Sequence, residues 1–328
     1  MALTLSGRAI VRPAALRRKR RRHRLVVLAF LAPWIIGFTV FFGYPFVATV
    51  YYSLTRYDLF TAPEFVGLLN YKFMVSDDPE VWTATKNTLW LVAVMVPAKI
   101  LFALGMATVL TRLRRGLGVW RSIFYLPALA PPVAATIAFV FLFNPEYGVV
   151  NNTLGVVGID DGPGWFTDPS WSKPSLTLLG LWGAGDVMII LLAALLDVPK
   201  DLYDAADVDG AGPAQRFRFI TLPTISPVLG FAAITGVIQT LQYFTQAAVA
   251  SGVAANRAST GKGGSDVLGF PEQSTLTYPL WLYVRGFAQN YLGYAAALAM
   301  ALLVVAFALT ALLLWRAPAL MGGDGENQ

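Results

Sequence analysis

Two residue types on which many catalytic and metal sites depend are almost missing from this sequence. Cysteine is absent, and the single histidine, His23, lies inside the basic run RRKRRRHR at positions 17–24. Without cysteine there is no disulfide framework and no thiolate ligand. Zinc sites and Ser-His or Cys-His catalysis likewise have almost nothing to use. We therefore expect no catalytic residue, metal site or cofactor in the chain itself, and a membrane-embedded hydrolase is a disfavoured alternative.

Charge is also scarce, and its distribution matters more than its amount. Only 13% of the 328 residues are charged and 56% are hydrophobic, whereas about a quarter of the residues of a typical soluble domain are charged. Long stretches contain no charged residue, among them 25–55, 122–145 and 224–256. A transmembrane helix needs about 20 mostly apolar residues. We predict an all-α integral membrane protein with six transmembrane helices, at about 27–49, 88–110, 123–143, 175–196, 227–249 and 292–314.

Basic residues near the ends of these runs predict the orientation, because Lys and Arg gather on the cytoplasmic side of membrane proteins. Seventeen of them fall on one side, most of them in an N-terminal arm and in the loops at 111–121 and 197–226, and seven fall on the other side. Both termini are therefore expected in the cytoplasm. Since the arm abuts the first apolar run, we interpret it as a topology signal with some attraction to anionic lipid, and not as a nucleic-acid site. The predicted organisation is an arm at 1–24, a transmembrane domain at 25–316 and a cytoplasmic tail at 317–328.

The most polar interruption of the apolar pattern is DAADVDGAGPAQRFRFITLP at 204–223, part of a loop that we place at 199–223. Gly210 can adopt the left-handed conformation that stops a helix, and Pro213 suits the first turn of the next one. We expect two short helices with a sharp bend between them, the second ending at Pro223. The small residues at the bend would let the backbone of a partner come close. An ordinary amphipathic loop at the membrane surface is the alternative.

This stretch resembles the EAA loop of ABC importer permeases, whose pattern is EAAxxDGAxxxxxFxxIxLP. Nine of the ten pattern positions match, and Asp204 replaces the usual glutamate, which keeps the charge but shortens its reach. The matching residues are Ala205, Ala206, Asp209, Gly210, Ala211, Phe217, Ile220, Leu222 and Pro223. The segments RSIFYLPALAPPVAATIAFVFLFNPEYGVVN (121–151) and YLGYAAALAM (291–300) are similar to carbohydrate importer permeases of the maltose/glycerol-phosphate type.

The resemblance implies the type I transmembrane domain of an ABC importer, with the loop acting as a coupling helix that docks onto an ATP-binding subunit. It also implies a location in a bacterial cell membrane and carbohydrate import by alternating access. The implied partners are a second homologous permease, two ATP-binding subunits and an extracytoplasmic sugar-binding protein. ATP and Mg²⁺ would be bound by those partners, because the segment STGKGG at 259–264 lacks the upstream glycine and the Ser/Thr after lysine of a phosphate-binding loop.

Two charges lie near the centres of predicted spans, Lys99 in the second and Asp186 in the fourth. Charges inside a membrane usually face a cavity or a partner. Three roles are open for them: facing inward, pairing with each other, or binding sugar hydroxyls through charge-assisted hydrogen bonds. A shifted register or contact with the second permease would also accommodate them. A proton-coupled secondary transporter that uses this pair is the alternative function, but it leaves the loop unexplained and predicts internal repeats that we do not find.

Several polar and aromatic residues in the fourth and fifth spans suit a sugar path, because sugars stack on aromatic rings and hydrogen-bond to amides and hydroxyls. These residues are Trp182, Gln239, Gln242, Tyr243 and Thr245. Gln239, Gln242 and Tyr243 would share one helical face, and hydrogen bonding between helices is an equally good explanation for them. Three prolines within 127–132 predict a kink in the third span, which is tolerated where neighbouring groups satisfy the backbone.

Overall fold

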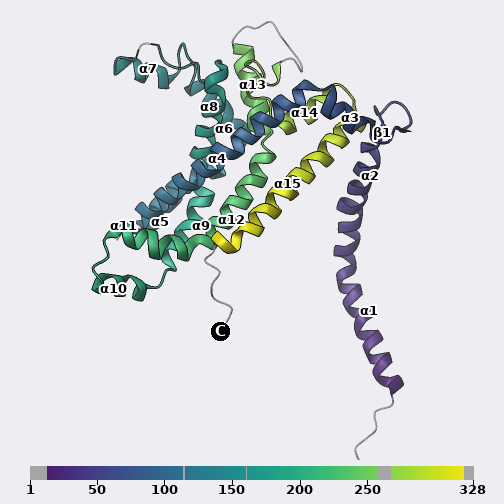
Figure 1. Ribbon diagram of the computed structural model, residues 1–328, viewed down its shortest axis with the longest axis horizontal. Helices are drawn as coiled ribbons and strands as arrows, with labels where there is room; N and C mark the ends of the chain where they lie inside the picture. The colour runs from purple at the N-terminus through teal and green to yellow at the C-terminus, as the bar shows by residue number, and fades with distance from the viewer. Residues whose placement is uncertain (1–12, 114, 160, 258–266, 321–328) are drawn as a thin grey trace, which may run out of the picture.

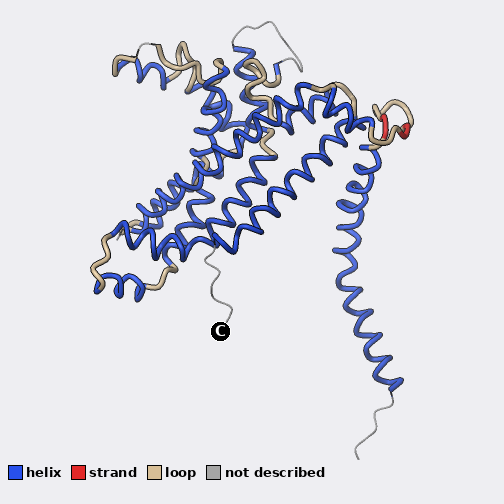
Figure 2. The backbone as a smooth tube through the Cα atoms, in the orientation of Figure 1, coloured by secondary structure: helices blue, strands red, loops and turns tan. Residues whose placement is uncertain are grey.

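The computed structural model describes residues 13–113, 115–159, 161–257 and 267–320. The helices form an elongated bundle (Figure 1), and most of the loops gather at its two ends (Figure 2). Within the described residues, four helices are long and apolar enough to cross a membrane, and the number rises to six if each of two bent helix pairs is one span. The all-α membrane fold predicted from the sequence is therefore confirmed.

The N-terminal helix stands apart from the rest of the bundle along its first part, α1 (Pro13–Phe38), as Figure 1 shows. It consists of α1, a π-helical turn η1 (Thr39–Gly43) and α2 (Tyr44–Ser53), which follow one another without a break. α2 packs against α15 (Leu292–Leu320). No residue of the most apolar stretch of this helix is buried within the chain. Lipid or another protein must therefore cover it.

A short antiparallel β-sheet and a small helix connect this N-terminal helix to α4 (Pro79–Thr111). The sheet pairs β1 (Thr55–Arg56) with β2 (Glu64–Phe65), and α3 (Leu69–Ser76) follows it. α4 then runs through the bundle, and its most extensive contacts are with four other helices. They are α8 (Pro169–Trp182), α9 (Gly185–Leu196), α12 (Leu222–Leu241) and α14 (Tyr278–Tyr283).

The third predicted span, 123–143, is a bent pair of helices and not one continuous helix. It is built from α5 (Leu117–Tyr125), a 3-10 turn η2 (Leu126–Leu129) and α6 (Pro132–Leu142), with a bend of 93°. Proline lacks an N–H donor and disfavours the helical conformation in the residue before it. Consecutive prolines at 131 and 132 therefore interrupt the helix, and the kink predicted from them is present.

The fourth and fifth predicted spans, 175–196 and 227–249, are also broken. α8 and α9 form the second bent pair, with an angle of 50° between them. α12 ends at Leu241, and α13 (Thr245–Arg257) starts after a short non-helical segment. That segment contains neither glycine nor proline. Instead, the Tyr243 carbonyl accepts a hydrogen bond of 2.8 Å from the hydroxyl of Thr277, a residue far away in the sequence.

The apolar core lies in two main clusters on either side of Lys99 along α4. One cluster includes Met95 and Leu280, and the other includes Ala103 and Met188. Lys99 lies between Met95 and Ala103 on α4, about one helical turn from each. Lys99 therefore separates these two clusters along α4, while a smaller cluster with Val96 and Ile100 continues past it.

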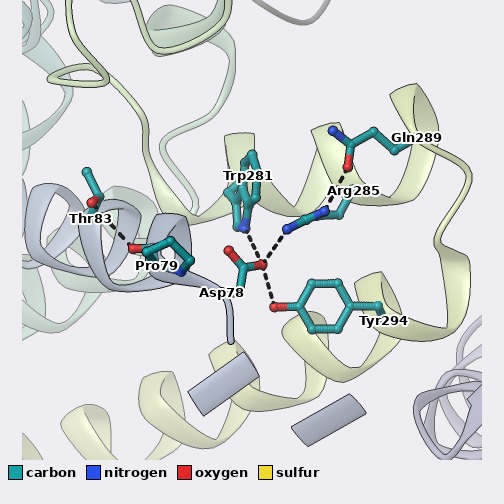
Figure 3. Close-up of polar contacts among 7 residues, drawn as sticks. All are labelled: Asp78, Pro79, Thr83, Trp281, Arg285, Gln289 and Tyr294. Atoms are coloured by element: carbon teal, nitrogen blue, oxygen red, sulfur yellow. Dashed lines mark hydrogen bonds and ion pairs between the residues drawn. The ribbon is translucent and has the colours of Figure 1, made fainter. Parts of the chain in front are cut away.

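A buried ion pair joins the start of α4 to α14 and α15 (Figure 3). Oδ2 of Asp78 accepts hydrogen bonds from Trp281 Nε1 (3.1 Å), Arg285 Nη2 (3.1 Å) and the Tyr294 hydroxyl (2.7 Å). Arg285 lies in a π-helical turn, η5 (Val284–Ala288), that follows α14. Burial by itself raises the pKa of Asp78, but the hydrogen bonds from Tyr294 and Trp281 and the Arg285 charge outweigh it and hold this pKa below its usual value.

Replacing Asp78 with alanine is expected to destabilise the fold by about 3–5 kcal/mol, because the Arg285 charge then lies buried without its partner. Thermal melting of the purified protein in detergent measures the effect, and Asp77→Ala is the matched control because Asp77 is exposed. Since the folded-state pKa of Asp78 is lowered, its contribution is complete above the unfolded-state pKa and disappears as the pH falls through the folded-state value. The difference in melting temperature from wild type should therefore shrink in acid. Equal melting of wild type and Asp78→Ala at neutral pH would contradict the prediction.

Candidate functional site

A cavity of about 540 Å³ lies where the broken helices meet. Each break contributes to its wall: Pro127 and Pro132 come from the third span, Gly183 from the fourth and Gln242 from the fifth. Non-helical backbone at membrane depth is tolerated where it is buried in protein or lines a cavity. Interrupted helices also form the solute sites of many membrane transporters. The geometry therefore marks this cavity as the candidate site for a solute.

The structure brings together at this cavity six of the seven residues that the sequence indicates for the substrate path. They are Lys99, Trp182, Asp186, Gln239, Gln242 and Tyr243. Thr245 is not among the lining residues, and it begins α13. The argument from a shared helical face is wrong in part, because α12 ends before Gln242 and Tyr243. Those two residues reach the cavity from the break and not from a helix.

Lys99 and Asp186 form an ion pair across the cavity wall. Lys99 Nζ lies 3.1 Å from Oδ1 and 3.2 Å from Oδ2 of Asp186. Asp186 lies in the first turn of α9, and its Oδ1 also accepts a hydrogen bond of 2.8 Å from the backbone N–H of Val187. Since a helix carries a partial positive charge at its N-terminus, this one carboxylate offsets both the lysine and the start of α9. The side chains are 21% and 43% exposed, respectively, so the pair remains open to the cavity.

The other predicted residues give the cavity neutral groups that can bind a polar solute. Trp182 is 42% exposed, and its ring lies tilted against Phe139 at 5.5 Å between ring centroids. Gln239 and Gln242 are exposed. Tyr243 is only 9% exposed, and its hydroxyl has no hydrogen-bond partner among the described residues. Because buried polar atoms are normally hydrogen-bonded, this hydroxyl is a candidate contact for a ligand.

The loop at 199–223 projects from one end of the bundle (Figure 1). Its first helix is α10 (Lys200–Val208), and its second is α11 (Pro213–Arg216). Between them Gly210 has a φ of +72°, the left-handed conformation expected from the sequence. The predicted pair of helices with a sharp bend is therefore present.

The expectation that Pro223 ends the second helix is wrong. The helix is continuous over 213–241, and it passes through a π-helical turn, η3 (Phe217–Thr221). The N–H of Leu222 bonds to the carbonyl five residues before it, and this wider turn accommodates a proline that has no N–H to donate. The loop and the cavity wall consequently belong to one helical rod of 29 residues, about 43 Å long at 1.5 Å per residue.

The residues that match the EAA pattern divide into two groups. Phe217, Ile220 and Leu222 are partly buried against the core cluster that includes Met188. The residues on the loop itself are exposed or half-buried: Asp204, Ala205, Ala206, Asp209, Gly210 and Ala211. Pro223 is exposed as well. One group therefore fixes the loop to the bundle, and the other presents a surface of small side chains.

Two contacts that sequence reasoning missed hold the bend of the loop together. Asp207 forms an ion pair with Arg216, and the hydroxyls of Tyr203 and Thr221 lie 2.8 Å apart. Asp209 follows the last residue of α10 and is exposed. Opposite charges flanking the Gly210 bend were the available signal for the Asp207–Arg216 pair.

Comparison with known proteins places the chain in a family. Residues 99–320 match the family described as binding-protein-dependent transport system inner membrane component. The chain belongs to this family. The matched region contains the cavity pair, the loop and the rod, so the candidate site lies within the part that the family shares. The chain is therefore an ABC importer permease subunit, a transport component and not an enzyme.

Several curated relatives align with most of this permease. It is 37% identical to the probable ABC transporter permease protein YesP of Bacillus subtilis (strain 168), over 90% of this chain and 91% of the relative. It is 32% identical to the sulfoquinovosyl glycerol transport system permease protein SmoG of Agrobacterium fabrum, over 89% and 90%. It is 36% identical to the lactose transport system permease protein LacF of Rhizobium radiobacter, over 77% and 80%.

A solved structure shows the same fold. It is a crystal structure of a bacterial ABC transporter involved in the import of the acidic polysaccharide alginate, and it aligns with a TM-score of 0.74 at 23% identity. The alignment covers 93% of this permease and 99% of that chain. At such an identity the likeness concerns the fold alone, which is the type I transmembrane domain of an ABC importer.

Sequence reasoning missed three further polar residues in the permease cavity: Thr235, Thr240 and Gln246. Thr235 lies one helical turn before Gln239, so extending the predicted polar face by four residues would have found it. Gln246 follows the break after α12, where helical spacing no longer relates it to the residues before.

Proposed function

We propose that this permease is a subunit of an ATP-driven, binding-protein-dependent carbohydrate importer in a bacterial cell membrane. Relatives named for lactose, sulfoquinovosyl glycerol and arabinooligosaccharide transport support a sugar as cargo. The observation that carries the proposal is the continuous rod over 213–241. One end of it belongs to the exposed loop, and residues near its other end, such as Thr235 and Gln239, line the cavity.

The proposed complex contains a second homologous permease, two ATP-binding subunits and an extracytoplasmic sugar-binding protein. The exposed apolar surface of α1 and α2 supports a further membrane partner, because such surfaces usually mark contacts with lipid or protein. The ATP-binding subunits would bind ATP and Mg²⁺ and contact the loop at Asp204, Ala205 and Gly210. Both termini of this chain would lie in the cytoplasm, on the same side as the loop.

Transport would follow from the rigid connection between loop and cavity. Closure of the ATP-binding subunits displaces the loop, and the rod carries that displacement to the wall formed by α12. This wall then moves relative to α4 and opens the cavity toward the sugar-binding protein. Trp182, Gln239 and Tyr243 bind the sugar weakly through ring stacking and neutral hydrogen bonds, so that it can leave again.

The function is tested by purifying the permease together with candidate second-permease, ATP-binding and sugar-binding subunits from the same organism and reconstituting them in liposomes. Uptake of radiolabelled lactose, arabinotriose and similar sugars should require ATP, the ATP-binding subunits and the binding protein together. Sugar counterflow by this chain alone, without ATP, would instead support the proton-coupled secondary transporter.

Single cysteines introduced into this cysteine-free chain test the proposed orientation. Ala214→Cys places an exposed thiol on the loop, and Val156→Cys places one at the end of α7 (Val149–Val156), where Val156 is 87% exposed. Figure 1 shows these two elements at opposite ends of the bundle. On intact cells an impermeant maleimide should label Val156→Cys readily and Ala214→Cys only after permeabilisation. Ready labelling of Ala214→Cys from outside would refute the orientation.

A further inference from the structure

We propose that the cavity is built for an uncharged sugar, and that Asp186 serves as a permanent counterion that prevents Lys99 from binding an anionic one. This inference rests on the proposed function, and it narrows the substrate class of the same cavity. The ion pair would set the substrate specificity of the cavity. It would neither transfer protons nor bind a charged group of the cargo.

The charges of the cavity are balanced within its own wall. Among the described lining residues, Lys99 and Asp186 are the charged ones, and they pair with each other at 3.1 Å. An anionic sugar that enters meets the attraction of Lys99 and the repulsion of Asp186 at nearly the same distance. The two electrostatic energies almost cancel. They therefore do not compensate for the hydration that the anion loses when it leaves water.

The helix ends at the cavity do not change this balance. α6, α9 and α13 begin near it, whereas α8 and α12 end near it, so partial charges of both signs face the cavity. The start of α9 is the one closest to the ion pair, and the Asp186 carboxylate already accepts the N–H of Val187 there. A helix start that could otherwise attract an anion is thus occupied by the chain's own carboxylate.

The remaining polar groups suit hydroxyl groups on the ligand. Thr235, Gln239, Gln242 and Gln246 offer neutral donors and acceptors along the wall. The buried hydroxyl of Tyr243 has no partner among the described residues, so a hydroxylated ligand would satisfy it. The volume of about 540 Å³ falls within the range of about 300–1,000 Å³ that small-molecule sites occupy.

The electrostatic part of the proposal is tested without knowledge of the cargo. In the reconstituted complex, Gln239→Cys places a single thiol of this chain in the cavity. The thiol is reacted with two methanethiosulfonates of similar size, the anionic ethylsulfonate and the cationic ethyltrimethylammonium. Each reaction rate is divided by the rate at which the same reagent reacts with a free thiol in solution. Mass spectrometry of this chain reports the labelling.

With the native pair, the two normalised rates are expected to agree within about threefold. Adding Asp186→Asn should favour the anionic reagent by about tenfold, Lys99→Met should favour the cationic reagent by a similar factor, and the double variant should return the ratio to near one. A native cavity that prefers the anionic reagent tenfold or more would overturn the proposal, because Lys99 would then act as an unbalanced cation.

Uptake measurements test the consequence for the cargo. The wild-type complex should import uncharged sugars such as lactose or arabinotriose at least tenfold faster than digalacturonate. The double variant Lys99→Met/Asp186→Asn should retain more uptake than either single variant, since it alone keeps the cavity neutral. Digalacturonate uptake as fast as that of the neutral sugars would refute the inference and leave the importer function standing. A complex that imports no sugar with ATP would refute the importer function, while the thiol ratios would still decide the charge balance.

Discussion

Complexes that carry Ala205→Glu or Gly210→Val in this permease are expected to assemble in the membrane and to lose most of their binding-protein-stimulated ATPase activity. Ala205 is exposed on α10, so a longer charged side chain there leaves the packing of the chain intact. It would occupy the space that an ATP-binding subunit needs for close approach. The proposed docking surface is therefore altered without a change in the bundle.

Gly210→Val acts through the backbone. A Cβ at Gly210 meets no atom of this chain within 4 Å, but the φ of +72° is a conformation that residues with a side chain avoid. The left-handed conformation costs about 1–2 kcal/mol in a residue with a Cβ, and more for a β-branched one. A penalty of that size shifts the population of the correctly bent loop by about five- to thirtyfold.

Gly212→Ala provides the matched control two residues away. Gly212 has a φ of −71°, which any residue adopts, and the nearest atom to an added Cβ is 3.7 Å away. The measurement is ATPase activity in proteoliposomes with and without the loaded binding protein, together with the amount of ATP-binding subunit that co-purifies. If Ala205→Glu and Gly210→Val keep full stimulation, the loop is not the coupling element and the central functional proposal fails.

The loop was predictable because its features are local. A glycine that stops a helix and a proline that starts the next act on neighbouring residues, and both did so at Gly210 and Pro213. The continuity of the second helix across Pro223 was not predictable in the same way. It depends on a π-helical turn in which the N–H of Leu222 bonds one residue further back than usual, and no residue pattern that we considered indicates that choice.

The residues that line the cavity were largely predictable from the sequence, but the breaks in the helices that shape it were less so. Charged and amide residues inside apolar runs must face something polar, which was enough to select Lys99, Asp186 and Gln239. The break after α12 depends instead on a hydrogen bond from Thr277 to the Tyr243 carbonyl, 34 residues apart. Contacts between residues so far apart leave no periodic pattern in the sequence. Gln242 and Tyr243 therefore line the cavity from a non-helical segment, where the sequence pattern predicts a helix.

Replacing Gly185 with valine is expected to prevent α5 and α9 from packing together, and so to displace the turn η2 after α5, whose Pro127 and Ala128 line the cavity. An added Cβ at Gly185 would lie against the carbonyl oxygen of Phe124 and 2.8 Å from the Cα of Tyr125. Both are backbone atoms, which cannot rotate away as a side chain can. Overpacking in a core costs about 1–3 kcal/mol, and more when the backbone must move.

The bend between α8 and α9 supplies its own control. Gly183 lies two residues earlier in the same bend, and the nearest atom to an added Cβ there is 3.8 Å away, an ordinary contact distance. Gly183→Ala should therefore fold and melt like wild type, whereas Gly185→Val should reduce the yield of folded permease severalfold and melt at a lower temperature. Size-exclusion chromatography and thermal melting in detergent measure both quantities.

Because Asp186 follows Gly185 directly, any Gly185→Val protein that still folds should also have a displaced ion pair, and its uptake per folded molecule should fall. Normal melting and normal uptake in Gly185→Val would show that α5 does not pack on the start of α9 in the membrane.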